Sequence, residues 1–115
     1  RAPAFDLTPP PTLDAPEGRG VTTLVSRSNG VPPPAHRWHR DGAPLKESDV
    51  VRGTATPVLT LLDAHHRIHP GVYVCVAENR FGRAETSACS VYVVHPRGGT
   101  AWKELVALAG GGGGG

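Results

Sequence analysis

Residues 71–82 read Gly71-Val72-Tyr73-Val74-Cys75-Val76-Ala77-Glu78-Asn79-Arg80-Phe81-Gly82. Up to Ala77 the residues are β-branched, aromatic or small and apolar, as is typical of a β-strand, and Asn79 to Gly82 form a turn signal. Successive side chains of a strand point to opposite faces of its sheet. We therefore expect Tyr73, Cys75 and Ala77 to share the buried face of one strand.

Similar patterns lie on both sides of this segment. We expect strands over residues 21–28, 36–40, 58–62, 72–78 and 85–94, with short edge strands within 45–55. Turn signals such as Asp41-Gly42 separate them at intervals of about 8–12 residues, which is typical of an all-β sandwich. The chain has 115 residues, enough for one such domain.

The ends of the chain differ from this pattern. Residues 1–16 are rich in proline and predict a lead-in that ends in an edge strand. The sandwich core is then expected over residues 17–95. From Trp102, apolar residues follow at i+3, i+4 and i+7, which predicts a linker and a short amphipathic helix over 96–109. A glycine tail occupies 110–115.

The charge balance excludes several classes of partner. The net charge is +2, 19% of the residues are charged, and basic residues form no block. Nucleic-acid and anionic-lipid partners are therefore not expected. No apolar run approaches the roughly 20 residues that span a bilayer, so membrane insertion is not expected either.

The two cysteines, Cys75 and Cys89, are not expected to pair, and no cysteine precedes residue 75. A hairpin centred near residues 80–81 places Cys75 opposite about residue 86, and Cys89 then lies roughly 10 Å away. A disulfide requires Cα atoms within about 7 Å of each other. We therefore expect two reduced thiols, as in a reducing compartment.

Taken together, these residues resemble the I-set immunoglobulin family over about residues 3–94. The matching motifs are Pro3-x-Phe5, Glu17-Gly18, Gly30-x-Pro32-x-Pro34, Trp38-x-x-Asp41-Gly42, Leu59-x-Leu61 and Gly71-x-Tyr73-x-Cys75-x-Ala77-x-Asn79-x-x-Gly82. The resemblance implies a Greek-key β-sandwich whose fold signature is Trp38, Leu61, Tyr73 and Cys75. It says little about the partner, because sandwiches carry many functions.

Three positions depart from the family pattern. The first cysteine of the family is replaced by Ser26 or Val25, depending on the motif from which one counts. We favour Val25, since Val21, Thr23 and Val25 would then line the inner face. His69 stands where the family carries an acidic residue, so a carboxylate contact is not expected there. His36 is expected to be a partly buried histidine near the end of the sandwich.

Domains without the paired cysteines are frequent in giant cytoskeletal and sarcomeric proteins such as titin, obscurin, palladin and the striated-muscle kinases, and the chain resembles that branch. The resemblance implies a non-catalytic structural and protein-interaction module, with neighbouring domains in the same cytoplasmic, cytoskeleton-associated chain. The alternative is an extracellular adhesion or receptor domain, since individual domains of that branch also lose the bridge.

Candidate chemistry is sparse. His65, His66 and His69 cluster in one connection and could contribute to a zinc site, but no cysteine or paired carboxylate lies at ligand spacing. We expect a solvated polar loop and no metal or cofactor. Asp63, His66 and a serine lack a nucleophile elbow, so no enzymatic activity is expected. Cys89 shares its parity with Val91 and is expected to be an inward apolar residue.

The remaining candidate is a sheet face. If Tyr73 and Trp38 point inward, the opposite face carries a set of apolar residues beside two basic ones: Arg37, His39, Val72, Val74, Val76, Tyr92 and Val94. An apolar patch with a polar border is typical of a protein-binding surface. Two alternatives remain open. The valines are simply good strand formers, or the segment around Trp102 folds back over this face.

Overall fold

The computed structural model describes residues 1–95, so the predicted helix and glycine tail lie outside the described residues. The strands are β1 Ala4–Leu7, β2 Thr12–Pro16, β3 Val21–Val25, β4 Arg27–Asn29, β5 Ala35–Arg40, β6 Ala43–Pro44, β7 Val51–Arg52, β8 Val58–Leu62, β9 Gly71–Asn79, β10 Gly82–Glu85 and β11 Cys89–Val94. Helices are absent from this described part of the chain, so none is present there that could span a bilayer.

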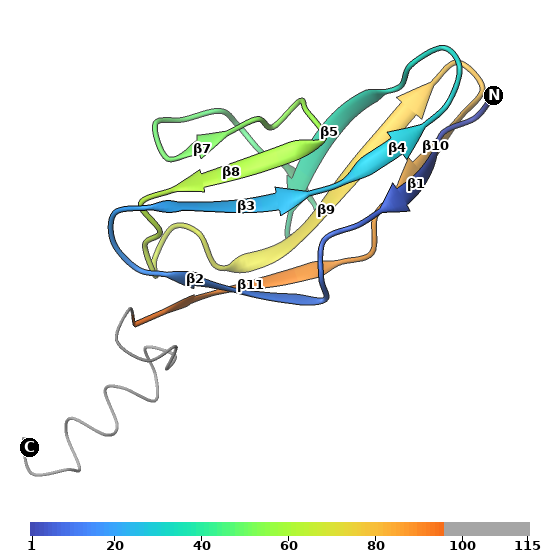
Figure 1. The fold of residues 1–115 in the computed structure, drawn as a ribbon. Helices are drawn as coiled ribbons and strands as arrows, with labels where there is room; N and C mark the ends of the chain where they lie inside the picture. Colours follow the sequence, from blue (N-terminus) through green and yellow to red (C-terminus); the bar gives the residue numbers. More distant parts are fainter. Residues whose placement is uncertain (96–115) are drawn as a thin grey trace, which may run out of the picture.

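The strands form two facing layers (Figure 1). One sheet has the order β2-β11-β9-β5-β6, with β10 also paired to β9, and the other has the order β3-β8-β7. A two-stranded pair, β1 with β4, extends the molecule at one end. The chain changes layer repeatedly, for example between β2 and β3 and between β8 and β9, and the predicted all-β sandwich is confirmed.

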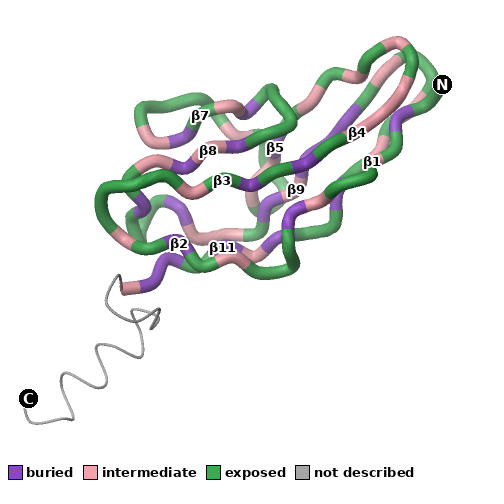
Figure 2. The backbone as a smooth tube through the Cα atoms, viewed as in Figure 1, coloured by how far each residue is buried: buried purple, intermediate pink, exposed green. Residues whose placement is uncertain are grey.

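The core lies between the two layers, where Leu24 is the buried residue of β3 and buried residues alternate with half-buried ones along β8 (Figure 2). Trp38 is fully buried, and its indole Nε1 donates a hydrogen bond to the Thr56 carbonyl at 2.8 Å. The other residues of the fold signature, Leu61, Tyr73 and Cys75, are each at most 1% exposed. The remaining large, fully buried side chains are Leu24, Leu59, His69, Val91 and Cys89.

The predicted inner face of β3 is wrong by one residue. Val21 and Val25 are 65% and 41% exposed, whereas Leu24 and Ser26 are 0% and 4% exposed. Leu24 pairs with Leu59, which is buried, and directly paired residues of two strands share a face. Because β8 sets the register, Ser26 and not Val25 stands at the position of the family's first cysteine.

The strand predicted over residues 85–94 is interrupted. Thr86 is held against Cys75, because its N–H donates to the Cys75 carbonyl at 2.9 Å and its Oγ1 accepts the Cys75 N–H at 2.9 Å. Cys89, three residues later, pairs with Tyr73, only two residues further along β9. The extra residue is a bulge, and it separates β10 from β11.

Residues 1–16 contain two strands where the sequence predicted one. β1 pairs with β4, and β2 lies parallel to β11 in the other sheet. Pro9, Pro10 and Pro11 form the crossing between them, as expected of residues that cannot donate a ladder hydrogen bond. Within residues 45–55, the structure has the single strand β7.

Candidate interaction face and histidine corner

His69 fills the corner between β8 and β9. It is fully buried, its Nδ1 accepts the His65 N–H at 2.9 Å, and its Nε2 donates to the Val50 carbonyl at 3.1 Å. The Tyr73 hydroxyl donates to the His69 carbonyl at 2.6 Å, and burial raises the pKa of Tyr73 to about 12. The imidazole therefore supplies the acceptor that a carboxylate would offer, together with a donor that a carboxylate lacks.

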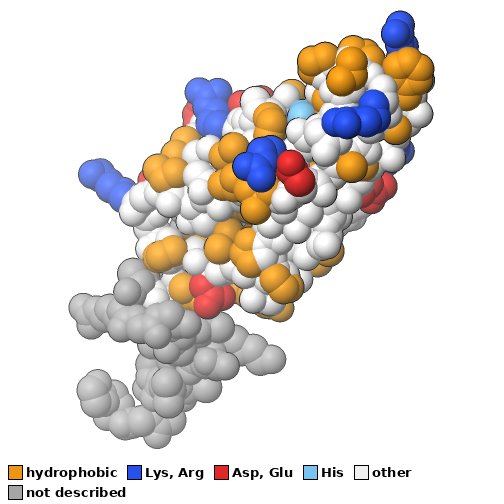
Figure 3. Space-filling view, turned by 45° about the vertical axis from the view of Figure 1, so that its right-hand side comes forward, with side chains coloured by type: hydrophobic (Ala, Val, Ile, Leu, Met, Phe, Trp, Pro, Cys, Tyr) orange, Lys and Arg blue, Asp and Glu red, His pale blue; other side chains and the backbone are white. Residues whose placement is uncertain are grey.

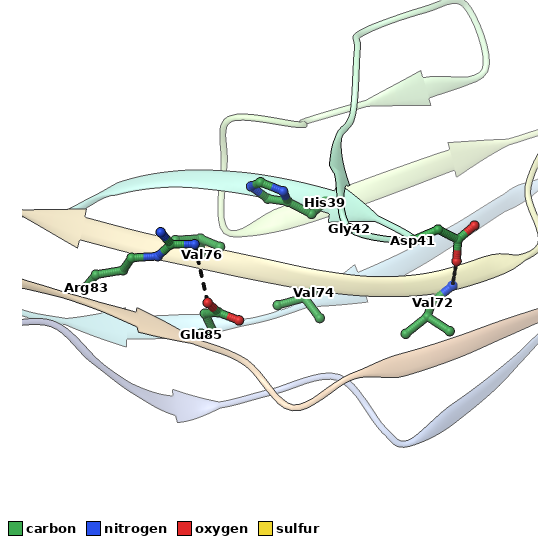
Figure 4. A pocket seen from close by; sticks show the side chains of 8 residues that line it. All are labelled: His39, Asp41, Gly42, Val72, Val74, Val76, Arg83 and Glu85. Carbon is green, nitrogen blue, oxygen red and sulfur yellow. Dashed lines mark hydrogen bonds and ion pairs between the residues drawn. The ribbon is translucent and has the colours of Figure 1, made fainter.

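The face of the β5–β9–β10 sheet that points away from the core carries a hollow of about 510 Å³, here called the outer groove. Its lining residues are His39, Asp41, Gly42, Val72, Val74, Val76, Arg83 and Glu85. The pairing brings them together, because His39 is opposite Val74 and Glu85 is opposite Val76. Figure 4 shows the three valines in a row along β9, with His39 beside them on β5.

Both ends of the outer groove are polar. At one end, Asp41 Oδ1 accepts the Val72 N–H at 2.9 Å. Asp41 and Gly42 have φ of 51° and 84°, the two positive values of a tight hairpin turn that suits Asp-Gly. At the other end, Arg83 and Glu85 form an ion pair at 3.3 Å (Figure 4). The groove therefore has an aliphatic floor between charged ends.

The structure brings four of the seven predicted face residues into the groove: His39, Val72, Val74 and Val76. Val76 is only 8% exposed and forms part of the floor. Arg37 pairs with Val76 on the same face and donates from its Nη2 to the Leu45 carbonyl at 3.1 Å. Tyr92 is 51% exposed on β11.

Val94 does not belong to this exposed face, since it is 4% exposed. Alternation predicts the direction of the Val94 side chain from its own strand, but it does not predict which residues cover the end of β11. Sequence reasoning missed Asp41, Gly42, Arg83 and Glu85. The Asp-Gly turn was recognised, but only the β5–β9 register shows that it lies beside Val72. Arg83 was missed because the second hairpin strand was expected to begin at residue 85 and begins at Gly82.

Apolar side chains are also exposed on the outer face of the β3–β8 sheet. Val25 and Val58 are a direct pair, 41% and 38% exposed, and Val21 is 65% exposed. Figure 3 shows hydrophobic side chains in several small groups separated by polar atoms. Exposed valines therefore occur on the outer faces of both sheets. What distinguishes the sheet that contains β9 is the outer groove.

The cysteines are buried, unbridged thiols. Burial raises the pKa of the Cys75 thiol, and a side-chain hydrogen bond with Ser26 partly offsets this rise. Burial also raises the pKa of Cys89. Both sulfurs are therefore protonated at neutral pH and shielded from solvent, so they behave as small apolar residues and not as nucleophiles.

The family model of the immunoglobulin I-set domain matches residues 3–93, which include every strand but the last residue of β11. The chain belongs to the immunoglobulin I-set family. The I-set signature is thus built here with Ser26 facing Cys75 and with His69 at the tyrosine corner.

Curated relatives of this I-set domain are much longer proteins. Mouse hemicentin-2 is 40% identical over 63 residues, which are 55% of this chain and 1% of that protein. Human myelin-associated glycoprotein is 35% identical over 72 residues, 63% of this chain and 10% of that protein. The matched part is therefore a small fraction of each relative.

Solved structures similar to this I-set domain come from two kinds of protein. A chain in a mutant complex of titin M10 and an obscurin-like 1 Ig domain has a TM-score of 0.72 and 31% identity, covering 84% of this chain and 96% of that one. Tandem Ig repeats of Dlar have a TM-score of 0.71 at 22% identity, covering 79% and 47%, which shows the fold alone.

Proposed function

We propose that this I-set domain is a non-catalytic structural and protein-docking module of a larger protein, and that the outer groove binds the partner. The observation that carries the proposal is the row of Val72, Val74 and Val76 in a hollow of about 510 Å³ between charged ends. An apolar centre with a polar border is the usual anatomy of a protein interface.

The shape and chemistry of the groove favour a folded protein surface as the partner. Valines that recur every second residue along a strand fit an apolar ridge on another sheet. Asp41 at one end and the Arg83–Glu85 pair at the other offer both signs of charge, which fixes orientation more than affinity. We therefore infer that the partner is another immunoglobulin-like domain. A similar chain comes from a complex between titin M10 and an obscurin-like 1 Ig domain.

The parent protein is proposed to be cytoskeletal or muscular and cytoplasmic, as the cysteines suggest. A reducing compartment removes the advantage of a bridge between the sheets, and Ser26 leaves Cys75 without a sulfur partner. The likeness to a chain of the titin M10 and obscurin-like 1 complex, at 31% identity, supports this assignment.

An extracellular adhesion or receptor module is the second candidate. The sequence relatives that favour it include a myelin-associated glycoprotein and the inactive tyrosine-protein kinase 7 of mouse, which is 37% identical over 67 residues. In both candidates the domain is one small part of a longer chain and acts by binding another protein.

The test first captures the partner and then measures its affinity. A photo-crosslinking residue is placed at Val72 in the groove or at Val25 on the opposite sheet, which are matched at 42% and 41% exposure. The protein crosslinked only from position 72 is identified and purified. We expect Val74→Lys and Tyr92→Glu each to weaken its binding at least about tenfold in calorimetry, because a charge is placed in or beside an apolar interface.

Val25→Lys serves as the control, and its affinity should equal that of the wild type. Unchanged affinity of both Val74→Lys and Tyr92→Glu, with normal thermal unfolding, would refute the groove as the docking site. Crosslinking to a second copy of this chain would instead identify the partner as the domain itself.

A further inference from the structure

A cluster of polar side chains lies at the end of the sandwich where β2 finishes beside the β8–β9 connection. Glu17 follows β2, and its N–H donates to the Val94 carbonyl at 2.8 Å. The next N–H, of Gly18, donates to the Ala64 carbonyl at 3.0 Å. Backbone hydrogen bonds therefore join the end of β2 to two segments far from it in sequence, the end of β11 and the β8–β9 connection.

The side chains of the cluster converge on one point. His66 Nδ1 lies 2.7 Å from Glu17 Oε1, which also accepts the His66 backbone N–H at 2.9 Å. The rings of His65 and His66 are stacked, with centroids 4.8 Å apart and planes at 15°. One potential ligand atom from each of Glu17, His65 and His66 lies within 4.8 Å of the other two.

We propose that Glu17, His65 and His66 bind a divalent transition-metal ion such as Zn²⁺. Two imidazole nitrogens and one carboxylate oxygen are a donor set that zinc accepts, with solvent completing a four-coordinate site. The same donors disfavour Mg²⁺, which prefers oxygen ligands. His69, the third histidine of the sequence cluster, does not take part, because both of its nitrogens are already hydrogen-bonded inside the fold.

The electrostatics of the cluster suit a cation. Partial burial raises the pKa of Glu17, but the hydrogen bonds from His66 and the nearby imidazoles outweigh it, so the net pKa lies below its ordinary value. Glu17 is therefore a charged carboxylate at neutral pH, with its side chain 16% exposed. The His66 backbone N–H would still hold this carboxylate when the ring turns to the metal, so Glu17 is a preorganised first ligand.

Little movement is needed to form the site. Ligand atoms around a tetrahedral zinc ion are about 3.3 Å apart, given bonds of about 2.0–2.1 Å. The His66 side chain is 41% exposed, and His65 is also exposed, so a metal ion can reach both rings. The Arg67 N–H, which donates to His65 Nδ1 at 3.1 Å, belongs to an exposed residue and can bond to water when His65 binds the metal. Meanwhile the backbone around them stays anchored, since the His65 carbonyl accepts the N–H groups of Ile68 and His69 at 3.0 Å each.

Thermal unfolding in the presence of ZnCl₂ tests this site. A ligand that binds the folded chain raises its melting temperature, and zinc at about ten times its dissociation constant should raise it by about 5 °C. MgCl₂ should have no effect. Glu17→Gln and the double variant His65→Asn/His66→Asn should lose most of the response.

His36→Asn is the matched control, because His36 lies at the opposite end of the sandwich and should leave the zinc response unchanged. NMR of the wild-type chain gives an independent measurement: zinc should shift the imidazole signals of His65 and His66 and leave those of His36 and His69 in place. An absent zinc response in the wild type, an equal response in the double variant, or shifts confined to other histidines would overturn the proposal.

Discussion

Ser26 and Cys75 meet in the centre of the sandwich, where the family usually has a covalent link. The Ser26 hydroxyl donates to the Pro57 carbonyl at 2.6 Å, and the Ser26 N–H donates to the same carbonyl at 3.0 Å. A buried hydroxyl with a partner costs little, whereas an unpaired one would be destabilising. The Ser26–Pro57 bond lies within the β3–β8 sheet, so the two sheets are held together by the packed core and by bonds such as that from Trp38 Nε1 to the Thr56 carbonyl, without sulfur chemistry.

The variant Ser26→Cys should form a disulfide with Cys75 under oxidising conditions. A new bridge across a loop of this length is expected to raise the free energy of unfolding by about 2–4 kcal/mol, because it restricts the unfolded chain. Urea denaturation with and without dithiothreitol measures this difference, and a thiol count verifies the bond.

Ser26→Ala is the control for that variant. It loses only the hydroxyl, so it should be destabilised by about 1 kcal/mol, equally with and without reductant. A bridge-free Ser26→Cys protein after oxidation would mean that the two side chains do not face each other in the geometry described.

At the scale of strands, the local sequence pattern predicted where strands lie better than it predicted which of their faces is buried. The strands around Leu61 and Tyr73 were identified because β-branched, aromatic and apolar residues cluster there, and the strand around Trp38 was identified by the turn signal Asp41-Gly42 that closes it. Residues 21–25 are Val-Thr-Thr-Leu-Val, with β-branched residues on both faces, so the pattern alone does not determine which face is inside. The pairing of β3 with β8 determines which face of β3 is buried. Because that pairing involves two strands, the sequence of β3 alone does not reveal it. The bulge at Thr86 is non-local in the same way.

The contact between β5 and β4 makes stability depend on pH. His36 lies 2.8 Å from Ser28 Oγ, its ring meets Phe5 edge-on at 6.2 Å, and burial lowers its pKa below the ordinary value of 6.5. Below pH 6.5, His36 is therefore protonated more readily in the unfolded chain than in the folded chain. We expect the free energy of unfolding to fall as the pH drops below 6.5 and to level off beneath the lowered pKa.

His36→Gln separates this effect from the other histidines. Glutamine can keep a hydrogen bond to Ser28 and does not titrate, so the variant should lose less stability on acidification than the wild type. Urea denaturation at a series of pH values from about 7 to about 5 provides the comparison. Parallel curves for the two proteins would assign the pH dependence to other groups.

At the scale of the whole molecule, the fold was largely predictable and the sites were predictable in part. The residues that define the sandwich carry local signals, such as Tyr-x-Cys before a turn. The outer groove combines one predicted valine row with the Asp41-Gly42 turn and with β10, and the proposed metal site joins Glu17 to histidines of the β8–β9 connection. Such contacts depend on chain segments that meet only after folding, so spacing in sequence does not reveal them.

The proposed compartment gives a prediction for the whole chain. If the parent protein is cytoplasmic, protein taken from its native source with immediate alkylation should contain two free thiols, Cys75 and Cys89, under denaturing, non-reducing conditions. Mass spectrometry after alkylation counts them. An intermolecular disulfide at either position would instead favour the extracellular alternative, because such bonds persist in oxidising compartments.

The serine opposite Cys75 also matters when the domain is pulled from its ends. A bond between positions 26 and 75 would prevent the 48 residues between them, 27–74, from extending. At about 3.5 Å per residue, that stretch holds about 170 Å of chain. Here no covalent tether shields it, so one rupture event releases the full contour length, and a stretched array of such domains would gain extra reach from each module that opens.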